Sequence, residues 1–259
     1  MKKMKKAIVI VLCMAIAFVT GRATAEVSEL VGKTMPDFTV TTSDGEALSL
    51  QQVLGKKDVV VLNIFTTWCP PCRMEFPDME RVYRDLSGRM EIIAVSDEPD
   101  DTLGDIAEYK EELGLSFPMG LGKGVSDFAA IEGYPTTLVI DSSGMIGYYQ
   151  LGAFANEAQF RRIVDYFTAD HYDGTPAGAY NVYVCDQDGQ PVPGVVLKFC
   201  DTACQLYTSD AEGIIAFVGR PVRYSIQIVR VPDGYGCDAS FEAVCDGSGE
   251  WVIVQVAKE

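Results

Sequence analysis

Histidine is nearly absent from this chain, because His171 is the only one among its 259 residues. A protein zinc site usually needs about four ligands, so one histidine far downstream of the closely spaced cysteines argues against a metal site. A haem attachment motif is also missing, since Arg73 follows Cys72 where that motif has histidine. The chain has no nicotinamide or flavin motif either. We therefore expect no metal and no cofactor, and we interpret His171 as a solvated side chain.

Basic residues are scarce relative to acidic ones. The chain carries 21 Lys and Arg against 37 Asp and Glu, which gives a formal net charge of −16. Five of the basic residues and none of the acidic ones lie in the first 25 positions, so the remainder carries a net charge of −21. Nucleic acids and anionic lipid surfaces repel such a protein. We expect an acidic, exported protein that does not bind nucleic acid.

The N-terminal segment 1–25 has the pattern of a secretory signal peptide. Its charged head contains Lys2, Lys3, Lys5 and Lys6. Ala7–Thr20 is apolar but short for a membrane span, and Ala23-Thr24-Ala25 supplies the small residues of a cleavage site. The pattern predicts cleavage before Glu26 and an extracytoplasmic location, either secreted or in the cell envelope. An uncleaved N-terminal anchor is the alternative.

Two cysteines separated by two prolines lie where a strand is predicted to lead into a helix. The run 58–65 is almost continuously apolar, which indicates a strand buried on both faces. Apolar residues recur at helical spacing over 74–86, so a helix should begin at the cysteines. Cys69 would be its N-cap, where the helix dipole favours a thiolate, and Pro70 and Pro71 would occupy the first two helical positions. We interpret the pair as a redox dithiol, in preference to half a metal site or a structural disulfide.

The stretch Trp68-Cys69-Pro70-Pro71-Cys72, followed by Glu75-Phe76-Pro77, resembles the TlpA/ResA-like thiol–disulfide oxidoreductases. These are extracytoplasmic proteins with the thioredoxin fold, and Pro77 lies where that fold has a helix-kinking proline. The resemblance covers 26–167. Crossovers from strand to helix to strand, followed by a hairpin and a last helix, predict an α/β domain with a mixed sheet covered on both faces.

The resemblance also implies a substrate site around the cysteines. Pro135, within Gly133-Tyr134-Pro135-Thr136, would be a cis-proline facing Cys69 and Cys72. Residues that would border a bound substrate are Trp68, Pro70, Pro71 and Tyr134. From the sequence alone, the alternative for Pro135 is an ordinary turn that opens a strand.

Two polar residues near the cysteines are candidates for proton handling. Glu75 lies one helical turn beyond Cys72, and in ResA-like proteins a glutamate at this offset is implicated in proton transfer. The alternative is an acid that only stabilises the helix dipole. Asn63 stands where thioredoxin has a buried aspartate, and we interpret it as a hydrogen-bonded core residue.

The residue pattern changes after Phe167. Residues 168–178 are polar and contain glycine and proline, which predicts a linker. Residues 179–259 alternate short strand-like runs with Asp-Gly, Pro-Gly and Glu-Gly turns, which predicts an all-β, antiparallel sandwich. The order of its turns resembles a Cna-B or carboxypeptidase-regulatory-like domain. No asparagine follows Lys198, so we do not expect the lysine–asparagine isopeptide bond that some such domains contain.

Five cysteines belong to this second domain: Cys185, Cys200, Cys204, Cys237 and Cys245. Structural disulfides are expected in an exported domain. Pairs between Cys200 and Cys204 and between Cys237 and Cys245 would each close a short loop and leave Cys185 free. Two bonds among five cysteines allow about fifteen arrangements, so the connectivity stays open.

These patterns together predict an extracytoplasmic enzyme that reduces protein disulfides. Reduced Cys69 would attack a substrate disulfide, and the more buried Cys72 would resolve the mixed disulfide. Because export separates the protein from cytosolic reductants, a membrane thiol protein is implied as its electron donor.

Two alternatives remain at this point. A thioredoxin-fold peroxidase has the pattern Pro-x-x-x-Thr-x-x-Cys, in which Thr66 fits but Leu62 occupies the proline position. A surface binding or scaffold protein is the other alternative, with a cell-surface partner held by the β-sandwich. Peroxide consumption without a disulfide substrate would favour the first, and partner binding that survives loss of both active-site cysteines would favour the second.

Overall fold

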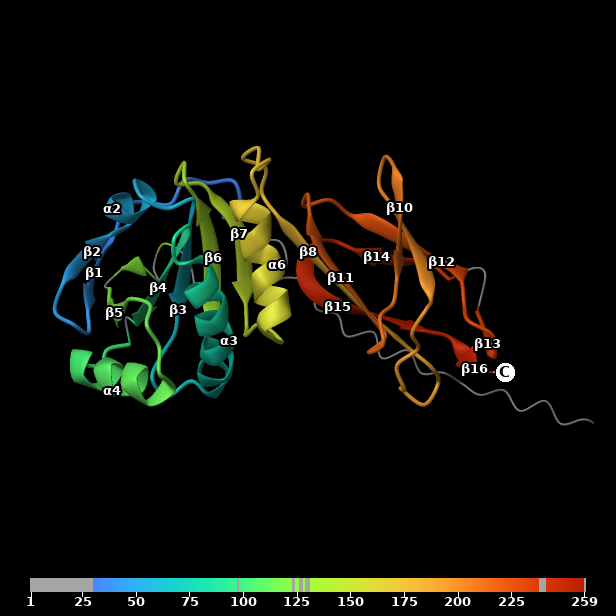
Figure 1. The fold of residues 1–259 in the computed structure, drawn as a ribbon, viewed down its shortest axis with the longest axis horizontal. Helices are drawn as coiled ribbons and strands as arrows, with labels where there is room; N and C mark the ends of the chain where they lie inside the picture. Colours follow the sequence, from blue (N-terminus) through green and yellow to red (C-terminus); the bar gives the residue numbers. More distant parts are fainter. Residues whose placement is uncertain are drawn as a thin grey trace, which may run out of the picture.

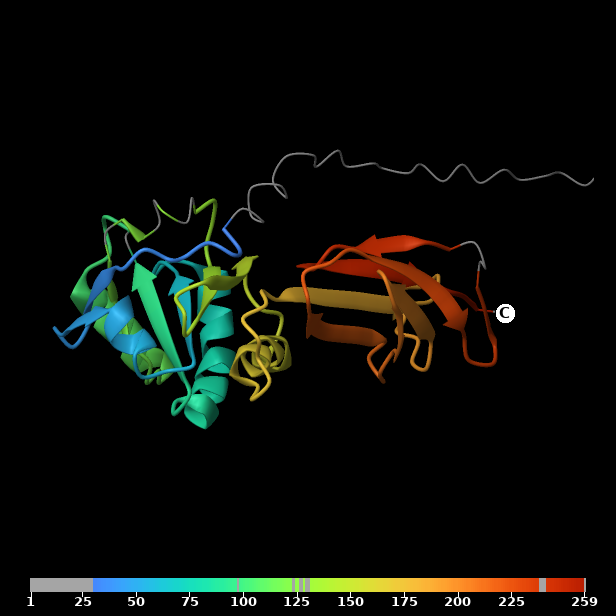
Figure 2. The same cartoon turned by 90° about the horizontal axis from the view of Figure 1, so that it is seen from above.

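The computed structural model describes residues 30–96, 98–122, 124–125, 128, 131–237 and 241–258, without the side chain of residue 250. The predicted signal segment 1–25 therefore lies outside the described residues. Within these ranges, no helix is both long and apolar enough to cross a bilayer. The chain forms two lobes, one of helices and strands and one of strands (Figures 1 and 2).

A seven-stranded sheet forms the centre of the first lobe. Its strands are β1 (Thr39–Thr42), β2 (Ala47–Ser49), β3 (Val59–Ile64), β4 (Met90–Ser96), β5 (Met119–Leu121), β6 (Thr136–Asp141) and β7 (Ile146–Leu151). They lie in the order β2-β1-β5-β4-β3-β6-β7. The strands β3, β4 and β5 are parallel, whereas β6 and β7 are antiparallel to their neighbours. This mixed sheet confirms the predicted thioredoxin-like α/β fold.

Helices pack on both faces of this sheet. They are α2 (Leu50–Leu54), α3 (Pro70–Leu86), α4 (Leu103–Leu113) and α6 (Glu157–Thr168). Val59 and Val61 of β3 belong to one apolar core with α3, α4 and α6, whereas Val60 and Leu62 belong to a second core with α2. All residues of β3 are buried, which confirms the strand predicted from its apolar run.

Side-chain caps fix where two of the helices begin. Asn156 caps α6, and its side chain accepts a hydrogen bond of 2.9 Å from the backbone N–H of Gln159. The short helix α2 is not indicated by the apolar pattern. It begins at Ser49, whose side chain and backbone form a capping box with Gln52.

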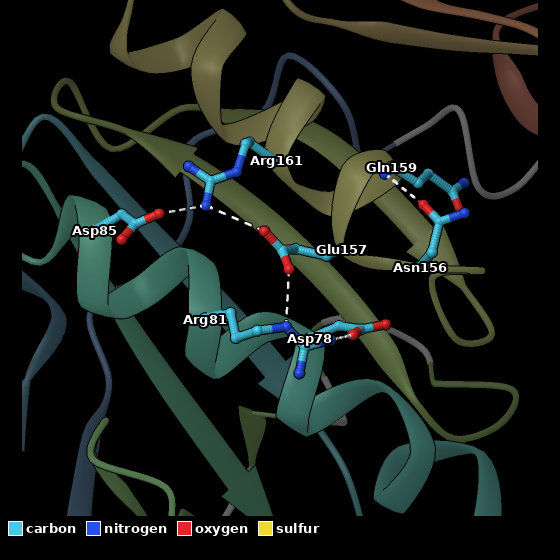
Figure 3. Close-up of polar contacts among 7 residues, drawn as sticks. All are labelled: Asp78, Arg81, Asp85, Asn156, Glu157, Gln159 and Arg161. Atoms are coloured by element: carbon cyan, nitrogen blue, oxygen red, sulfur yellow. Dashed lines mark hydrogen bonds and ion pairs between the residues drawn. The ribbon is translucent and has the colours of Figure 1, made fainter.

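Charged side chains join α3 to α6 at the surface (Figure 3). Glu157 accepts a hydrogen bond of 2.8 Å from Arg81 and one of 3.2 Å from Arg161. Arg81 also pairs with Asp78, and Arg161 pairs with Asp85. This network ties the helix that carries the cysteines to the last helix of the lobe.

We expect Glu157→Gln to lower the melting temperature slightly, because the change removes both ion pairs of the central carboxylate. Hydrogen bonds from Arg81 and Arg161 hold the pKa of Glu157 below its ordinary value. The stabilisation is therefore complete above that ordinary value and is lost as pH falls through the lowered, folded-state pKa. Thermal unfolding at about pH 7 and about pH 2, at low and high salt, measures it. Glu111→Gln is the control, because Glu111 is exposed on α4. An equal decrease in melting temperature with that change would show that the ion pairs of Glu157 are not the cause.

The second lobe is a β-sandwich. Its main strands are β8 (Gly178–Cys185), β9 (Val196–Cys200), β10 (Cys204–Thr208), β11 (Ile214–Gly219), β12 (Tyr224–Arg230), β14 (Ala243–Cys245) and β15 (Ser248–Gln255), and β13 (Tyr235–Gly236) pairs with β16 (Ala257–Lys258). One sheet has the order β10-β9-β12-β14 and the other β11-β8-β15, with an apolar core formed by both. The strands β15 and β8 are parallel, so the prediction of a purely antiparallel sandwich is wrong at this pair.

The segment predicted as a linker packs on the first lobe. The helix α6 ends at Thr168, and β8 already begins at Gly178. In between, the Tyr172 hydroxyl donates to Asp141 at 3.0 Å, and the N–H of Ala177 donates to the carbonyl of Gly147 at 2.8 Å. Ala177 and Ala179 are buried in the same apolar cluster as α6. The two lobes thus share a packed interface.

Candidate active site

Cys69 and Cys72 form a disulfide at the start of α3. Cys69 is the N-cap, Pro70 and Pro71 occupy the first two helical positions, and the Cys72 N–H donates to the Cys69 sulfur at 3.2 Å. This geometry matches the arrangement predicted from the sequence. Cys69 is 3% exposed and Cys72 is fully buried. Cys69 is therefore the sulfur that a substrate can approach, although it is less accessible than its predicted role suggests.

The loop before β6 faces the same end of the sheet. The Tyr134–Pro135 peptide bond is cis, as the resemblance implies. Thr136, the next residue, pairs with Ile64 at the end of β3, from which the chain continues to the cysteines. Trp68 is 62% exposed, and its ring meets the ring of Tyr134 edge-on at 6.0 Å between centroids. The predicted substrate-binding residues Trp68 and Tyr134 therefore lie together beside the disulfide.

Glu75 is buried one turn beyond Cys72, at 1% exposure. One carboxylate oxygen accepts a hydrogen bond of 2.8 Å from the Asn63 side chain, and the other accepts one of 3.0 Å from the backbone N–H of Phe154. Burial raises the pKa of Glu75 to about 7, while these two hydrogen bonds oppose the shift. Asn63 also donates to Thr137 at 3.0 Å, which fits its interpretation as a hydrogen-bonded core residue.

Asp101 fixes the loop between β3 and α3, and the sequence patterns do not single it out. Its buried carboxylate accepts hydrogen bonds from the Thr67 N–H at 3.1 Å and from the Ser96 hydroxyl at 2.7 Å. The Thr67 hydroxyl donates to it as well. Thr67 directly precedes Trp68, so the carboxylate positions the residues that lead into Cys69. Asp101 lies among other acidic residues, so the neighbouring sequence does not indicate this role.

We expect Asp101→Ala to destabilise the fold by about 2–3 kcal/mol, because the Thr67 N–H and two hydroxyls lose a charged acceptor. Urea-induced unfolding measures the change. Asp100→Ala is the matched control, since Asp100 is exposed and adjacent in sequence. Equal destabilisation by the two substitutions would show that Asp101 does not hold this loop.

The described residues of the second lobe include one disulfide. Cys200 and Cys204 are bonded, and they face each other across the β9–β10 hairpin. Cys237 and Cys245 are both free thiols, so their predicted disulfide is not formed. Cys245 is buried in β14 of the four-stranded sheet, whereas Cys237 is exposed beyond β13, which belongs to another sheet. Cys185 is also a free thiol, as the predicted pairing implied, and it is buried.

The first lobe is similar in sequence to known proteins. The AhpC/TSA family model matches residues 31–149. The thioredoxin-like protein YneN of Bacillus subtilis is 31% identical over 140 residues, 53% of this chain and 81% of that protein. ResA of Halalkalibacterium halodurans, a thiol-disulfide oxidoreductase, is 34% identical over 130 residues, 49% of this chain and 71% of its own.

Among solved structures, a thiol:disulfide interchange protein of the thioredoxin family from Chlorobium tepidum is 32% identical, with a TM-score of 0.45. The match covers 52% of this chain and 94% of the other. StoA from Bacillus subtilis is 24% identical, with a TM-score of 0.42, and the match covers 49% and 94% of the two chains. On the sequence matches and the observed sheet and disulfide, the chain belongs to the thioredoxin-fold thiol–disulfide oxidoreductases related to ResA and YneN.

Proposed function

We propose that this oxidoreductase reduces disulfides of protein substrates outside the cytoplasm, through the dithiol form of Cys69 and Cys72. The observation that carries the proposal is the pair itself: one sulfur at a helix N-cap, a second buried behind it, and the Pro135 loop at the same sheet end. The helix dipole and the Cys72 N–H stabilise a thiolate at Cys69.

The reaction balances as a two-electron exchange. The Cys69 thiolate attacks one sulfur of the substrate disulfide, which breaks that bond and releases the other substrate sulfur as a thiolate. Cys72 then loses its proton and attacks Cys69 in the mixed disulfide. The second substrate sulfur leaves, so the substrate gains two electrons and the enzyme ends with the Cys69–Cys72 disulfide.

Glu75 is proposed to accept the proton that Cys72 loses in the second step. It lies one helical turn from Cys72 in the buried interior, and its pKa of about 7 lets both of its protonation states occur near neutral pH. Trp68, Pro70, Pro71 and Tyr134 are proposed to contact the substrate chain on either side of its disulfide.

The proposed location rests on the signal-like segment 1–25 and on the Cys200–Cys204 disulfide, which is typical of oxidising compartments. Outside the cytoplasm the oxidised enzyme needs a new pair of electrons for each turnover. We propose that a membrane thiol protein supplies them by exchange with the Cys69–Cys72 disulfide.

Insulin reduction tests the proposed activity. The full chain, reduced beforehand and freed of reductant, should reduce about one insulin disulfide per Cys69–Cys72 pair under anaerobic conditions. Hydrogen peroxide in place of insulin serves as the comparison. Oxidation of the enzyme by peroxide together with inertness toward insulin would overturn the proposal and favour a peroxidase.

A further inference from the structure

A cavity of about 590 Å³ lies between the two lobes, away from the cysteines. Its walls are α6 with the segment that follows it on one side, and β11 on the other. Figure 1 shows α6 beside the three-stranded sheet of the sandwich, and the two elements are in contact. The volume falls within the range of roughly 300–1,000 Å³ that is usual for ligand sites. None of its lining residues belongs to the redox site.

The strand β11 is an edge strand, because β8 is its one neighbour in the sheet order β11-β8-β15. The hydrogen bonds between β8 and β11 show in which direction each backbone group of β11 points. Val184 of β8 donates its N–H to Gly213, just before β11, at 2.7 Å. Hydrogen-bonded pairs alternate in an antiparallel ladder, so Ile215 and Phe217 bond to β8. The backbone groups of Ala216 point away from β8.

The hydrogen bonds on the other side of β8 independently check which residues of β11 point outward. Ala179 donates its N–H to Gly247, on the β15 side, at 2.9 Å. Ala179 is opposite Val218 in the ladder, so Val218 also directs its N–H and C=O to the free edge. Together, Ala216 and Val218 offer two donors and two acceptors, and both residues line the cavity.

One end of this edge is already covered within the chain. The N–H of Ile214 donates to the Asp210 carboxylate at 2.7 Å, and the Asp210 N–H donates to the Ile214 carbonyl at 3.0 Å. Among the described residues, no backbone group pairs with the outer edge of Ala216 or Val218. An open strand edge of this kind is a template for a further strand. The residues with open backbone groups, Ala216 and Val218, are among those that line the cavity.

The cavity also contains two arginines, Arg162 and Arg220. Neither forms an ion pair with any residue in the described part of the chain. Burial lowers the pKa of Arg162, which reflects a partly desolvated cation. Asp165 and Asp173 line the same cavity. Asp173 attracts Arg220 and Asp210 attracts Arg162, but neither pair comes within ion-pair distance. An unpaired, half-buried guanidinium favours a ligand with a carboxylate.

We propose that this cavity binds an extended acidic peptide segment of a partner protein, which adds as a strand to β11. Its backbone would pair with Ala216 and Val218, and its carboxylate would meet Arg162 and Arg220. Tyr166 and Tyr172 line the opposite wall, where side chains of the peptide can pack. The cavity volume of about 590 Å³ suits a few residues of extended chain. The inference goes beyond the redox chemistry, because it gives the β-sandwich a partner of defined chemistry.

Binding of a synthetic peptide tests this proposal. The probe is a fluorescein-labelled, acetylated and amidated peptide Thr-Val-Glu-Val-Thr-Val, titrated with the full chain and followed by anisotropy. Saturable binding is expected, and Ala216→Pro should weaken it at least tenfold. Proline removes the outward N–H of Ala216 and leaves the ladder to β8 intact, which edge strands tolerate. No saturation up to about 1 mM protein would overturn the proposal.

Leu206→Pro is the matched control. Ser209 donates its N–H to Val195 at 2.9 Å, which places the N–H of Leu206 on the free edge of β10 by the same alternation. Leu206 is also exposed. Binding should persist in Leu206→Pro, and equal loss in both proline variants would overturn the assignment to β11.

The chemistry of the peptide provides a second measurement that does not depend on how a proline variant folds. A peptide with N-methylated alternate residues cannot pair as a strand and should bind at least tenfold more weakly. Replacing Glu by Lys in the peptide, or Arg162→Gln in the protein, should each weaken binding about fivefold. Unchanged binding of the N-methylated peptide would exclude strand addition, and equal binding of the Lys peptide would exclude the acidic ligand. Insulin reduction serves as the check that the redox lobe is unaffected.

Discussion

Cys69→Ser is expected to abolish disulfide reduction, lowering turnover with insulin by roughly a thousandfold or more. The reason is chemical, because a serine hydroxyl cannot attack a disulfide and become part of a mixed disulfide. Cys72 cannot replace it, since its side chain is fully buried behind Cys69. Stopped-flow or turbidity assays of insulin reduction measure the loss.

Cys72→Ser should behave differently from Cys69→Ser. The first attack can proceed, but the mixed disulfide lacks a resolving thiol and accumulates as a covalent complex. Non-reducing electrophoresis and peptide mapping should place the substrate on Cys69. Cys237→Ser is the matched control, because Cys237 is an exposed free thiol outside the site and its loss should change nothing. A complex mapped to Cys237, or full activity in Cys69→Ser, would refute the assigned nucleophile.

Glu75→Gln is expected to lower turnover about a hundredfold near neutral pH and to remove an ionisation from the pH–rate profile. Burial places the pKa of Glu75 at about 7, so the wild-type rate should rise with pH as this carboxyl becomes able to accept a proton. Glutamine keeps the shape of the side chain but accepts no proton. Insulin reduction between about pH 5 and pH 9 measures both effects.

The same ionisation predicts how stability depends on pH. The pKa of Glu75 is raised from 4.5 to about 7, so between these values the folded state holds a proton that the unfolded state has released. Stability therefore falls as pH rises through this window, by about 1.4 kcal/mol per pH unit and roughly 3 kcal/mol in total. Urea unfolding at several pH values should show this slope in the wild type and a flatter one in Glu75→Gln.

Glu80→Gln is the control for both measurements. Glu80 is also buried on α3, but its carboxylate pairs with Arg84 and accepts hydrogen bonds from Ser116. The change should leave the ionisation of Glu75 in the pH–rate profile. If Glu80→Gln removed that ionisation and Glu75→Gln kept it, Glu75 would not be the proton acceptor.

The redox half of the fold could be predicted from the sequence because its signals are local. The apolar run that ends at Ile64 indicates a strand buried on both faces, since β3 contacts two cores at once. The adjacent cysteines and prolines indicate a helix start, because an N-cap and prolines at the first helical positions are short-range preferences. The turns in residues 179–259 likewise indicated a β-sandwich, but they did not indicate that β8 and β15 pair in parallel. Residues far apart in sequence pair there, and no turn connects them directly.

What the sequence by itself determined is the chemistry: a cysteine pair at a helix N-terminus, with a glutamate one turn later, followed by a second domain of strands. Only the tertiary structure decided which groups surround that chemistry. Phe154 and Glu75 are 79 positions apart in sequence, and Asp101 and Thr67 are 34 apart. No periodic sequence pattern indicates either contact. The same holds for the unpaired Cys237 and for the open edge of β11, because burial and strand neighbours are set by how distant segments pack.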